Sequence, residues 1–323
     1  MDTPLPPSRA PTAPDAALAV CAALGVEPRA IQRLAVGHCH YVFGVTTADG
    51  REVVARLASV ESVDALAGGV YWHARLRGVG APLARLLAAD LAPPRGYPYM
   101  LLERLPGQDL ALVYTSLTRA QRQALAARIV ALQRRVATLP PASGYGFARS
   151  YVDPDLRASW LEVTLADVER SRERIEAAGV APLRHAARVR ARLLEMADDL
   201  RAVPPTAFLD DTTTKNVLVH EGDLSGVVDT DYVCFGDPLF TLALTRVALL
   251  AHELDPDYAD QWEALLALDD SQRRRLAAYV AVFSLGFISE LGQRFNRDAP
   301  PPVDPAYLRR MEALLDAALA ASA

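Results

Sequence analysis

The chain has 323 residues, of which 51% are apolar and 23% charged, and its net charge is −5. This length allows one large domain or two smaller ones, and the apolar fraction excludes global disorder. The acidic balance argues against a nucleic-acid partner, and no uncharged stretch is long enough to span a membrane. The proline-rich residues 1–14 are expected to form a flexible tail, because they lack the apolar core of a signal peptide.

The three cysteines lie far apart in the sequence, at positions 21, 39 and 234. Their odd number and wide spacing exclude a disulfide framework and favour a reducing compartment. We therefore expect a cytoplasmic protein.

Residues 15–104 are expected to form a small lobe rich in strands. A short helix over 15–25 has Asp15 as its candidate N-cap, and a second helix is expected over 62–78. Strands are expected over 31–36, 41–47, 51–57 and 97–104. Ala48-Asp49-Gly50 offers a good hairpin turn between the second and third of these strands.

Residues 105–323 are expected to form a larger, mainly helical lobe. Leu105-Pro106-Gly107 interrupts the strand pattern, and apolar residues recur at helical spacing after it. Helices are expected over 118–138, 155–178, 182–202, 237–254, 258–268, 271–294 and 305–321. The exception is 206–231, where the pattern indicates a hairpin with strands over 217–220 and 225–229.

Polar residues that suit phosphate and metal chemistry gather at this hairpin. Its antiparallel pairing brings Asn216 and Asp229 to one end, next to Asp211. Two carboxylates and an amide oxygen are hard ligands of the kind that Mg²⁺ prefers beside phosphate oxygens. Lys215, the only lysine in the chain, would supply a compact cation for a phosphoryl group. Asp and Asn are also common turn residues, so a purely structural, capped loop is the alternative.

The same segment resembles the signature of the aminoglycoside phosphotransferase family of kinase-like enzymes, H-G-D-x-x-x-x-N-V-L-V, then G-V-I-D, then G-D-P. The matching stretches are 209–219, 226–229 and 236–238. The resemblance implies an α+β, bilobal protein-kinase-like fold, with a small antiparallel N-lobe over 15–104 and a larger helical C-lobe over 105–323. It also implies that a nucleotide binds between the lobes.

The resemblance assigns roles to the matching residues. It implies that Asp211 acts as the catalytic base or orients the acceptor hydroxyl, and that Asn216 and Asp229 bind Mg²⁺. Leu209 and Asp210 replace the His and Gly of the signature. This departure leaves Asp210 as an alternative working carboxylate, although the spacing to Asn216 favours Asp211.

The N-lobe is expected to bind ATP or GTP. Gly37 and His38 lie in a turn between two strands, where backbone amides can cradle phosphates. Arg56 stands where the related V-A-I-K strand carries Lys, and it would offset the charge of the α- and β-phosphates. His38, Cys39 and His40 could instead bind a metal, but no distant Cys or His pair completes such a site, so a plain loop is favoured.

Two further contacts of the N-lobe are expected from the resemblance. The helix after the third strand should supply an acidic partner for Arg56, and Glu61 and Asp64 are the only acids near its start. Glu103 and Leu105 fall in the expected hinge between the lobes, which would contact adenine through backbone groups.

These features predict Mg²⁺-dependent transfer of the γ-phosphoryl group of ATP or GTP to a hydroxyl of a small molecule. An acidic chain suits a cationic acceptor such as an aminoglycoside or related amino-sugar, although the resemblance also allows sugars and amino alcohols. Asp231 could help to shape the metal or substrate site, and Asp237 would tie the segment to the following helix. The alternatives are a nucleotide-binding kinase-like protein that no longer transfers phosphate, and a Mg²⁺-dependent hydrolase that uses the same acids. A monomer and a homodimer are both compatible with the sequence.

Overall fold

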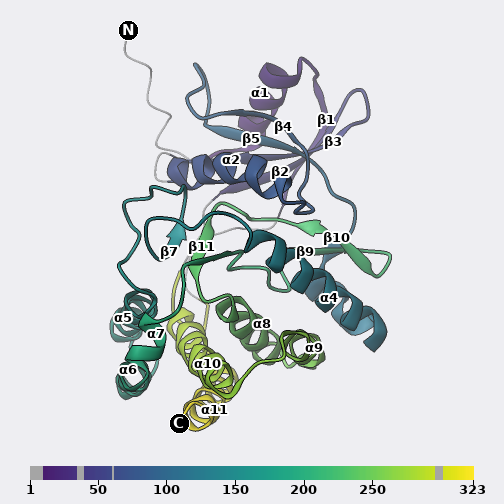
Figure 1. Ribbon diagram of the computed structural model, residues 1–323. Coiled ribbons are helices and arrows are strands. Elements are labelled where there is room, and N and C mark those ends of the chain that lie inside the picture. The colour runs from purple at the N-terminus through teal and green to yellow at the C-terminus, as the bar shows by residue number, and fades with distance from the viewer. Residues whose placement is uncertain (1–9, 35–39, 60–61, 295–300) are drawn as a thin grey trace.

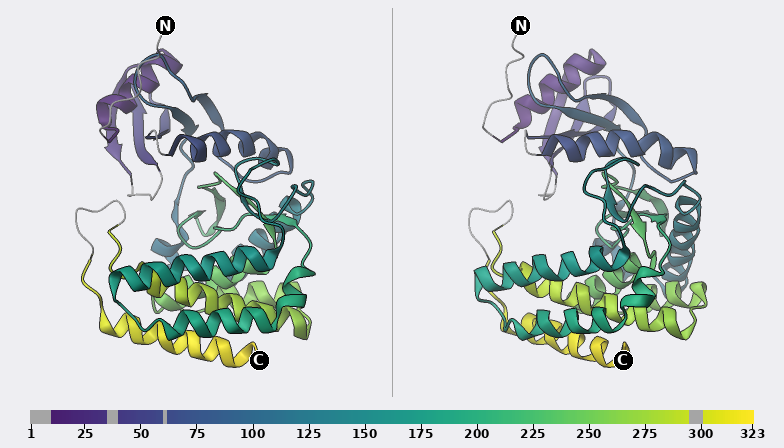
Figure 2. Two further views of the ribbon diagram at one scale, coloured as in Figure 1. Left: turned by 90° about the vertical axis from the view of Figure 1, so that its left-hand side faces the viewer. Right: turned by 60° about the vertical axis from the view of Figure 1, so that its left-hand side comes forward.

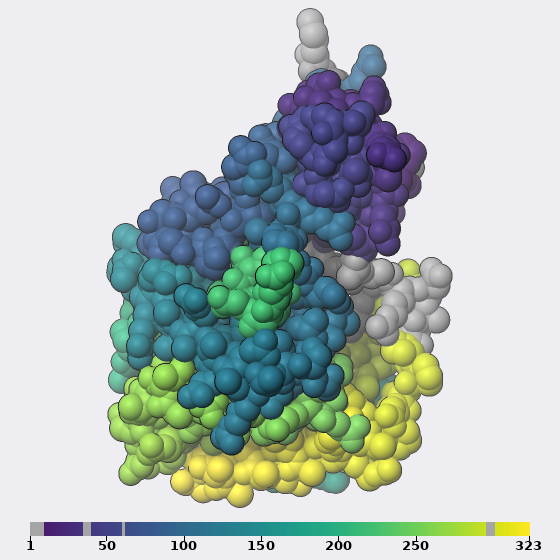
Figure 3. All heavy atoms as spheres, turned by 90° about the vertical axis from the view of Figure 1, so that its right-hand side faces the viewer, coloured from purple at the N-terminus to yellow at the C-terminus, as the bar shows by residue number. Residues whose placement is uncertain are grey.

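The computed structural model describes residues 10–34, 40–59, 62–294 and 301–323. The molecule divides into a narrower N-lobe built on one antiparallel sheet and a wider C-lobe made mostly of helices (Figure 1). Figure 3 shows the N-lobe, in purple and blue, seated on the C-lobe. The fold is therefore α+β and bilobal, as the sequence predicts.

The N-lobe sheet has five antiparallel strands in the order β1-β2-β3-β5-β4. Its strands are β1 (Pro28–Arg33), β2 (Tyr41–Thr47), β3 (Glu52–Leu57), β4 (Leu86–Asp90) and β5 (Tyr99–Glu103). Phe43 and Val45 of β2 and Val53 of β3 are buried together with apolar residues of helix α1 (Ala13–Leu24). This alternation of buried side chains is what a strand with one covered face requires.

Helix α1 begins two residues earlier than the sequence predicts. Thr12 is its N-cap, and Asp15 lies at the third helical position. There, Asp15 Oδ2 accepts hydrogen bonds from the Thr12 amide and hydroxyl, at 2.8 and 2.6 Å. The residue expected to cap the helix is thus the second half of a capping box.

Helix α2 (Val63–Gly78) lies between the sheet and the C-lobe (Figures 1 and 2). Leu66 packs with Met100 of β5, whereas Trp72 belongs to the core of the C-lobe. Trp72 also donates a hydrogen bond from Nε1 to the Ala148 carbonyl at 2.6 Å. Because both of its faces are buried, α2 joins the two lobes.

The C-lobe contains two small sheets and a set of packed helices. Its strands are β6 (Gln108–Asp109), β7 (Gly146–Ala148), β8 (Thr206–Phe208), β9 (Val217–His220), β10 (Asp223–Val227) and β11 (Val233–Gly236), in the orders β10-β9-β6 and β7-β11-β8. Its helices are α3 (Leu110–Val113), α4 (Arg119–Val136), α5 (Trp160–Ala178), α6 (Arg184–Glu195), α7 (Ala197–Arg201), α8 (Leu239–Ala251), α9 (Asp257–Leu266), α10 (Asp270–Glu290) and α11 (Pro305–Ala321).

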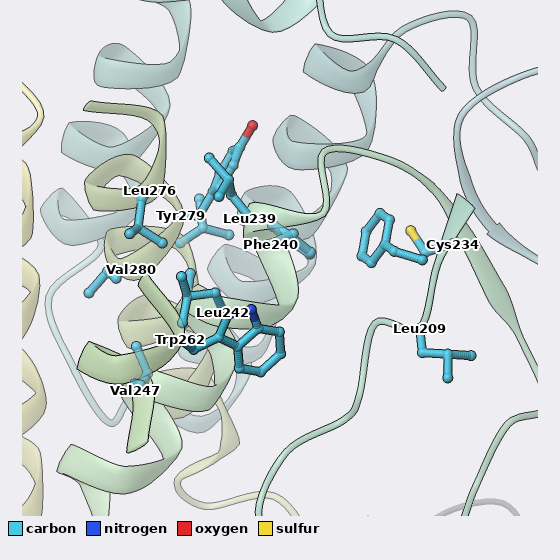
Figure 4. Close-up of a cluster of buried hydrophobic side chains, with 14 of the residues drawn as sticks. Leu209, Cys234, Leu239, Phe240, Leu242, Val247, Trp262, Leu276, Tyr279 and Val280 are labelled. Atoms are coloured by element: carbon cyan, nitrogen blue, oxygen red, sulfur yellow. The ribbon is translucent and has the colours of Figure 1, made fainter. Parts of the chain in front are cut away.

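Helix α10 lies at the centre of the C-lobe core, packed against α5, α8 and α11. Figure 4 shows a buried part of this core, in which α8, α9 and α10 contribute Leu239, Phe240, Leu242, Val247, Trp262, Leu276, Tyr279 and Val280. The Phe240 ring meets the rings of Trp160 and Tyr279 edge-on, with centroids 5.1 and 5.4 Å apart. Burial of this aromatic and aliphatic surface is the main favourable contribution to folding of the lobe. None of the helices in the described ranges combines the length and the apolar character that a membrane span requires.

The sequence locates the long elements well and the short ones poorly. Five strands of two to five residues, β4, β6, β7, β8 and β11, are missing from the sequence-based prediction, because so few residues give too little alternation to recognise. The helix expected over 182–202 is two helices that meet at Met196. The helix expected over 155–178 begins only at Trp160, where the Ser159 hydroxyl caps it by accepting a hydrogen bond from the Glu162 amide.

The connector between β5 and β6 lies against the β9–β10 hairpin. Gly107 has a φ of +103°, and a Cβ atom there would collide with the carbonyl of Val219. The Leu105 side chain lies against Gly226 of β10. The hinge candidate Leu105 and the nearby Gly107 are therefore packed on the same hairpin that carries Asn216 and Asp229 at its end.

Candidate active site

Loop 209–216, between β8 and β9, holds Asp211 by contacts within the loop. The Thr213 hydroxyl donates a hydrogen bond to Asp211 Oδ1 at 2.6 Å, and Asn216 Nδ2 donates to the Asp211 carbonyl at 3.0 Å. Within the described ranges no hydrogen bond reaches Asp211 Oδ2. That oxygen can accept a hydrogen bond from a bound hydroxyl.

Gln133, a buried residue of α4, holds loop 209–216 in place through hydrogen bonds. Gln133 Nε2 donates to the Leu209 carbonyl at 2.8 Å and to the Thr212 hydroxyl at 3.0 Å, while Gln133 Oε1 accepts from the Leu209 amide at 3.0 Å. Leu209 is itself buried, near Cys234 (Figure 4). Gln133 thus supports the loop backbone at the position where the signature carries His and this chain carries Leu209. Gln133 is not among the residues that motif spacing predicts for the site, although a glutamine on the buried face of a helix is a recognisable signal.

Asp229 lies two residues beyond β10, and its backbone adopts a conformation that residues other than glycine rarely adopt. Its φ is +59°, in the left-handed region, and such outliers persist where the surrounding structure enforces them. The Val228 amide donates to the Asn216 carbonyl at 3.0 Å, so the backbone places Asn216 and Asp229 side by side. The hairpin therefore brings Asp211, Asn216 and Asp229 together, as its length predicts.

The carboxylates of Asp210, Asp211 and Asp229 repel one another. Burial raises the pKa of Asp229, and the positive charge of Arg56 offsets only part of that rise. Burial, followed by the negative charge of Asp211, raises the pKa of Asp210 to about 8. The Asp229 side chain is 57% exposed, and the charges of Asp231 and Asp211 also contribute to the rise in its pKa. A site with this excess of negative charge favours a cation.

The donor set suits Mg²⁺ better than a transition metal. Asp229 offers a carboxylate and Asn216 an amide oxygen, and Mg²⁺ is commonly held by one or two such groups together with water and phosphate oxygens. Within the described ranges there is no group of three or more His, Cys, Asp or Glu residues arranged to enclose a metal. The residues present therefore fit a magnesium ion that a bound nucleotide would help to hold.

Arg56 contacts two acids of the C-lobe. Its Nη1 and Nη2 atoms donate to Asp231 Oδ1 and Oδ2 at 2.8 and 2.7 Å, and Nη2 also donates to Asp229 Oδ1 at 3.0 Å. Asp231 also contacts His40, whose Nε2 lies 2.7 Å from Asp231 Oδ2. We call His40, Arg56, Asp229 and Asp231 the Arg56 cluster. Burial works against an ionised Asp231, but the charge of Arg56 and the hydrogen bond of His40 together lower its pKa.

Two expectations about the N-lobe change here. Asp64, one of the two acids expected to pair with Arg56, instead lies 3.7 Å from Arg149, and Glu61 lies outside the described residues. The other change concerns His40, expected in a plain loop, which is buried against Asp231. The sequence could not reveal this contact, because its partners are 191 residues apart.

The four remaining nucleotide-binding candidates are Gly37, His38, Glu103 and Leu105. Gly37 and His38 lie outside the described residues. The Glu103 side chain points to the surface, where Arg85 Nε donates to it at 2.9 Å, and this hydrogen bond lowers the pKa of Glu103. The Glu103 amide donates to the Arg85 carbonyl at 2.9 Å. Among the described residues, no backbone hydrogen bond outside a helix or strand uses the Leu105 amide. An amide that is to donate to a bound base must be free in this way.

Lys215 is exposed at the end of loop 209–216. Its positive charge affects the pKa values of two residues beside the loop. Burial raises the pKa of Asp109, and Lys215 partly opposes that rise. Burial lowers the pKa of His252, and Lys215 lowers it further. The structure thus places Lys215 near Asp109 and His252.

Asp237 has the structural role that the sequence predicts. Its Oδ1 accepts from the Leu239 amide at 3.1 Å, and its Oδ2 accepts from Arg275 Nε and the Tyr279 hydroxyl, both at 2.9 Å. These bonds fasten the segment after β11 to α8 and α10. The buried carboxylate is therefore fully paired, as its position requires.

A model of the phosphotransferase enzyme family matches residues 30–279. No curated protein sequence matches the chain. Among solved structures, a thermostable mutant of aminoglycoside phosphotransferase APH(4)-Ia in its apo form has a TM-score of 0.69 at 17% identity, covering 95% of this chain and 99% of that one. Aminoglycoside phosphotransferase APH(2'')-Ib bound to ADP has a TM-score of 0.64 at 14% identity, covering 96% and 99%. A putative fructosamine-3-kinase from Thermobifida fusca has a TM-score of 0.59 at 17% identity, covering 94% and 97%.

The structural likeness spans nearly the whole length of each protein, so it identifies the kinase-like fold. The family match covers most of the chain and includes both loop 209–216 and the residues after β10. The chain therefore belongs to the phosphotransferase enzyme family, and it is a small-molecule kinase with a hydroxyl group as acceptor.

Proposed function

We propose that this protein transfers the γ-phosphoryl group of ATP or GTP to a hydroxyl of an amine-bearing small molecule, with Mg²⁺ as cofactor. The observation that carries the proposal is the convergence of Asp211, Asn216 and Asp229 at one end of the hairpin, next to Arg56. Phosphoryl transfer needs little more than positioned groups and offset charge, and this end of the hairpin offers both.

Asp211 would orient the acceptor hydroxyl and take its proton. The Thr213 hydroxyl holds Oδ1, so Oδ2 is the oxygen that would accept the hydrogen bond from the acceptor. Gln133 keeps the loop in place from the protein interior. We favour Asp211 over Asp210 because the pKa of Asp210, at about 8, leaves that neighbour mostly protonated near neutral pH.

Asn216 and Asp229 would hold Mg²⁺. The ion would neutralise charge on the β- and γ-phosphates when it is bound with the nucleotide. The chain's own contribution is to fix the two oxygen donors, and the bond between the Val228 amide and the Asn216 carbonyl does this.

The nucleotide would lie between the N-lobe (15–104) and the C-lobe (105–323). Arg56 would offset phosphate charge from β3, with Gly37 and His38 covering the phosphates from the preceding turn and Lys215 adding charge from loop 209–216. Backbone groups of Glu103 and Leu105 would contact the base. Similar structures have been solved with AMP-PNP, ADP and GDP, which supports a nucleotide but leaves both bases open.

The acidic residues near Asp211, among them Asp167 and Asp210, support an acceptor that carries a positive charge. Asp167 of α5 is buried, and burial raises its pKa, although Arg170 lies 2.7 Å from it. Burial raises the pKa of Asp210 most, and the charges of Asp211, Asp229 and Asp167 add to that rise. An ammonium group would offset this negative charge. A similar structure contains hygromycin B, an observation about that protein which agrees with an amino-sugar as acceptor here.

We also propose a cytoplasmic location for this activity. Cys21 and Cys234 are free thiols in the structure, as a reducing compartment would keep them.

The first test is binding and turnover of the intact chain. Thermal melting with Mg²⁺–ATP, Mg²⁺–GTP and Mg²⁺ alone should give a nucleotide shift that requires Mg²⁺, since a ligand at 100 times its Kd adds about 2.7 kcal/mol. A panel of hydroxylated amines and uncharged sugars with labelled nucleotide then identifies the acceptor class. Asp211→Asn should keep the nucleotide shift and lose transfer by at least about a hundredfold.

The matched control is Asp198→Asn, which makes the same chemical change at a fully exposed position and should transfer phosphate normally. Wild-type turnover in Asp211→Asn would refute the assignment of Asp211. Cleavage of phosphoesters without nucleotide would refute the kinase mechanism.

A further inference from the structure

We infer that Asp231 is the positioning residue for Arg56, and that it takes the place of an acid on helix α2, whose Asp64 lies against Arg149 instead. This inference rests on the proposed function, because Arg56 matters to catalysis only if it meets nucleotide phosphates. Asp231 does not touch the reacting atoms in this scheme. It acts by holding the guanidinium in one orientation.

The contact between Arg56 and Asp231 has the geometry of a firm, oriented pair. Two parallel hydrogen bonds of 2.8 and 2.7 Å join the guanidinium to the two carboxylate oxygens. The Arg56 side chain is 10% exposed and the Asp231 side chain 5%. A bidentate pair fixes the plane of the guanidinium as well as its position, and buried charges of this kind are stable only when paired.

Helix α2 leaves room for Asp231 where it passes Arg56. A Cβ atom at Gly69 would lie 3.7 Å from Arg56 Nη1 and would collide with Asp231 Oδ1. The adjacent Gly68 likewise gives way to the Asp231 carbonyl. The position of α2 that faces Arg56 therefore carries no side chain, and the Asp231 carboxylate fills that space.

The two acids on Arg56 differ in a way that divides their tasks. Asp229 makes one hydrogen bond to Arg56 and is 57% exposed, whereas Asp231 makes two and is almost completely buried. Asp229 is therefore free to serve a further ligand. Asp231 is committed to the N-lobe, which it also contacts through His40.

This arrangement makes the phosphate-binding cation depend on contact between the lobes. Arg56 and His40 come from β3 and from the residue before β2, and both meet one carboxylate of the C-lobe. Loss of that carboxylate should loosen the orientation of Arg56, and nucleotide affinity should suffer more than the transfer step.

The test compares Asp231→Asn with Asp153→Asn. Asp153 is an equally buried carboxylate with its own bidentate partner, Arg149, at 2.7 and 2.8 Å, and its side-chain hydrogen bonds involve Arg149 and Asp155 rather than Arg56. We expect Asp231→Asn to raise the KM for Mg²⁺–nucleotide about 10- to 100-fold, the size of a lost charged hydrogen bond, with a smaller change in kcat. Asp153→Asn should lower the melting temperature and leave that KM unchanged.

A relocated charge separates positioning from simple destabilisation. Because a Cβ atom at 69 would touch the present position of Asp231 Oδ1, an aspartate there can reach the same space. We expect the double variant Gly69→Asp, Asp231→Ala to recover most of the nucleotide affinity that Asp231→Ala loses. Gly69→Asp alone should bind nucleotide poorly, since it crowds two carboxylates together.

The outcomes are distinguishable. If the wild-type protein binds no Mg²⁺–nucleotide, the proposed function is wrong, and the role of Asp231 is wrong with it. If the wild-type protein binds nucleotide and Asp231→Asn binds it equally well, only the role of Asp231 is overturned. Equal losses in Asp231→Ala and in the double variant would also overturn that role, because the charge would then have been restored without effect.

Discussion

Within the residues that the structure describes, loop 209–216 and the Arg56 cluster each lack a side chain that the kinase pattern provides, and the replacement comes from a different place in each. In the loop, Leu209 stands in place of the motif His, and Gln133 of the same lobe holds the backbone. In the cluster, Gly69 faces Arg56, and the acid comes from Asp231 of the opposite lobe. The first replacement is internal to the C-lobe, and the second spans both lobes.

The difference predicts how each region responds to change. Loop 209–216 is built into the C-lobe core, so damage to its support should appear as lost stability and lost turnover. The Arg56 cluster depends on how the lobes meet, so damage there should appear first in nucleotide binding. The following changes test this contrast.

The largest effect on stability is expected from Gln133→Leu. The change leaves the buried amide and carbonyl of Leu209 without partners, and each unsatisfied group costs about 1–3 kcal/mol. Urea unfolding should show a loss of about 2–4 kcal/mol, with reduced kcat and an almost unchanged nucleotide KM. Gln123→Leu, at an exposed position of the same helix, is the matched control and should stay within about 0.5 kcal/mol of wild type. A stable, fully active Gln133→Leu protein would contradict the anchoring role.

A smaller loss, dependent on pH, is expected from Asp153→Asn in the segment that faces α2. The hydrogen bonds from Arg149 lower the pKa of Asp153 to about 2. Because the folded pKa lies below the unfolded value, the carboxylate stabilises the fold above about pH 4 and loses this contribution as the pH falls towards 2. The variant should be about 2 kcal/mol less stable at pH 7, and the difference should shrink at pH 3.

Unfolding in denaturant at pH 7, 5 and 3 measures this difference. Asp155→Asn removes an exposed carboxylate from the same Arg149 and serves as the control, with little effect at any pH. A gap between Asp153→Asn and wild type that stays constant down to pH 3 would show that the paired charge is not its source.

A still smaller effect on stability, joined to weaker nucleotide binding, is expected from Gly69→Ala. The added methyl group would press on the Asp231 carboxylate, and overpacking of this kind costs about 1–2 kcal/mol. Gly78→Ala is the matched control in the same helix, because nothing lies near its Cβ position. That control should gain about 0.5–1 kcal/mol from helix propensity alone. Calorimetry with Mg²⁺–nucleotide should show reduced affinity for Gly69→Ala only.

The sequence predicts the site where its contacts are local and fails where they are distant. Asp211, Asn216 and Asp229 meet because one short hairpin fixes their positions, so motif spacing is enough to find them. The contact of Gln133 with Leu209 spans 76 residues, and that of Arg56 with Asp231 spans 175. No periodicity or turn pattern encodes such pairs, since they depend on how whole lobes pack.

The same contrast between local and distant contacts explains which helices and strands the sequence predicts. Long helices such as α4 and α11 carry enough repeats to show their period, and the β2–β3 hairpin carries a clear turn. The strands β7, β8 and β11 contain three or four residues each. Ala148 of β7 pairs with Val233 of β11, 85 residues later, and Phe208 of β8 pairs with Cys234, 26 residues later, so their sheet emerges only in three dimensions.

The smallest effect is expected from Arg85→Ala at the hinge. The Arg85–Glu103 ion pair is exposed on both sides, and pairs of this kind contribute little because water and salt screen them. The hinge would serve the base through its backbone, and the Glu103 amide bonds to the Arg85 carbonyl, which an alanine at 85 retains. Melting temperature and nucleotide Kd should therefore match those of wild type. A clear loss of nucleotide affinity would show that the Glu103 side chain, freed from its partner, affects the base directly, and the contrast between a side-chain cluster at Arg56 and a backbone contact at the hinge would fail.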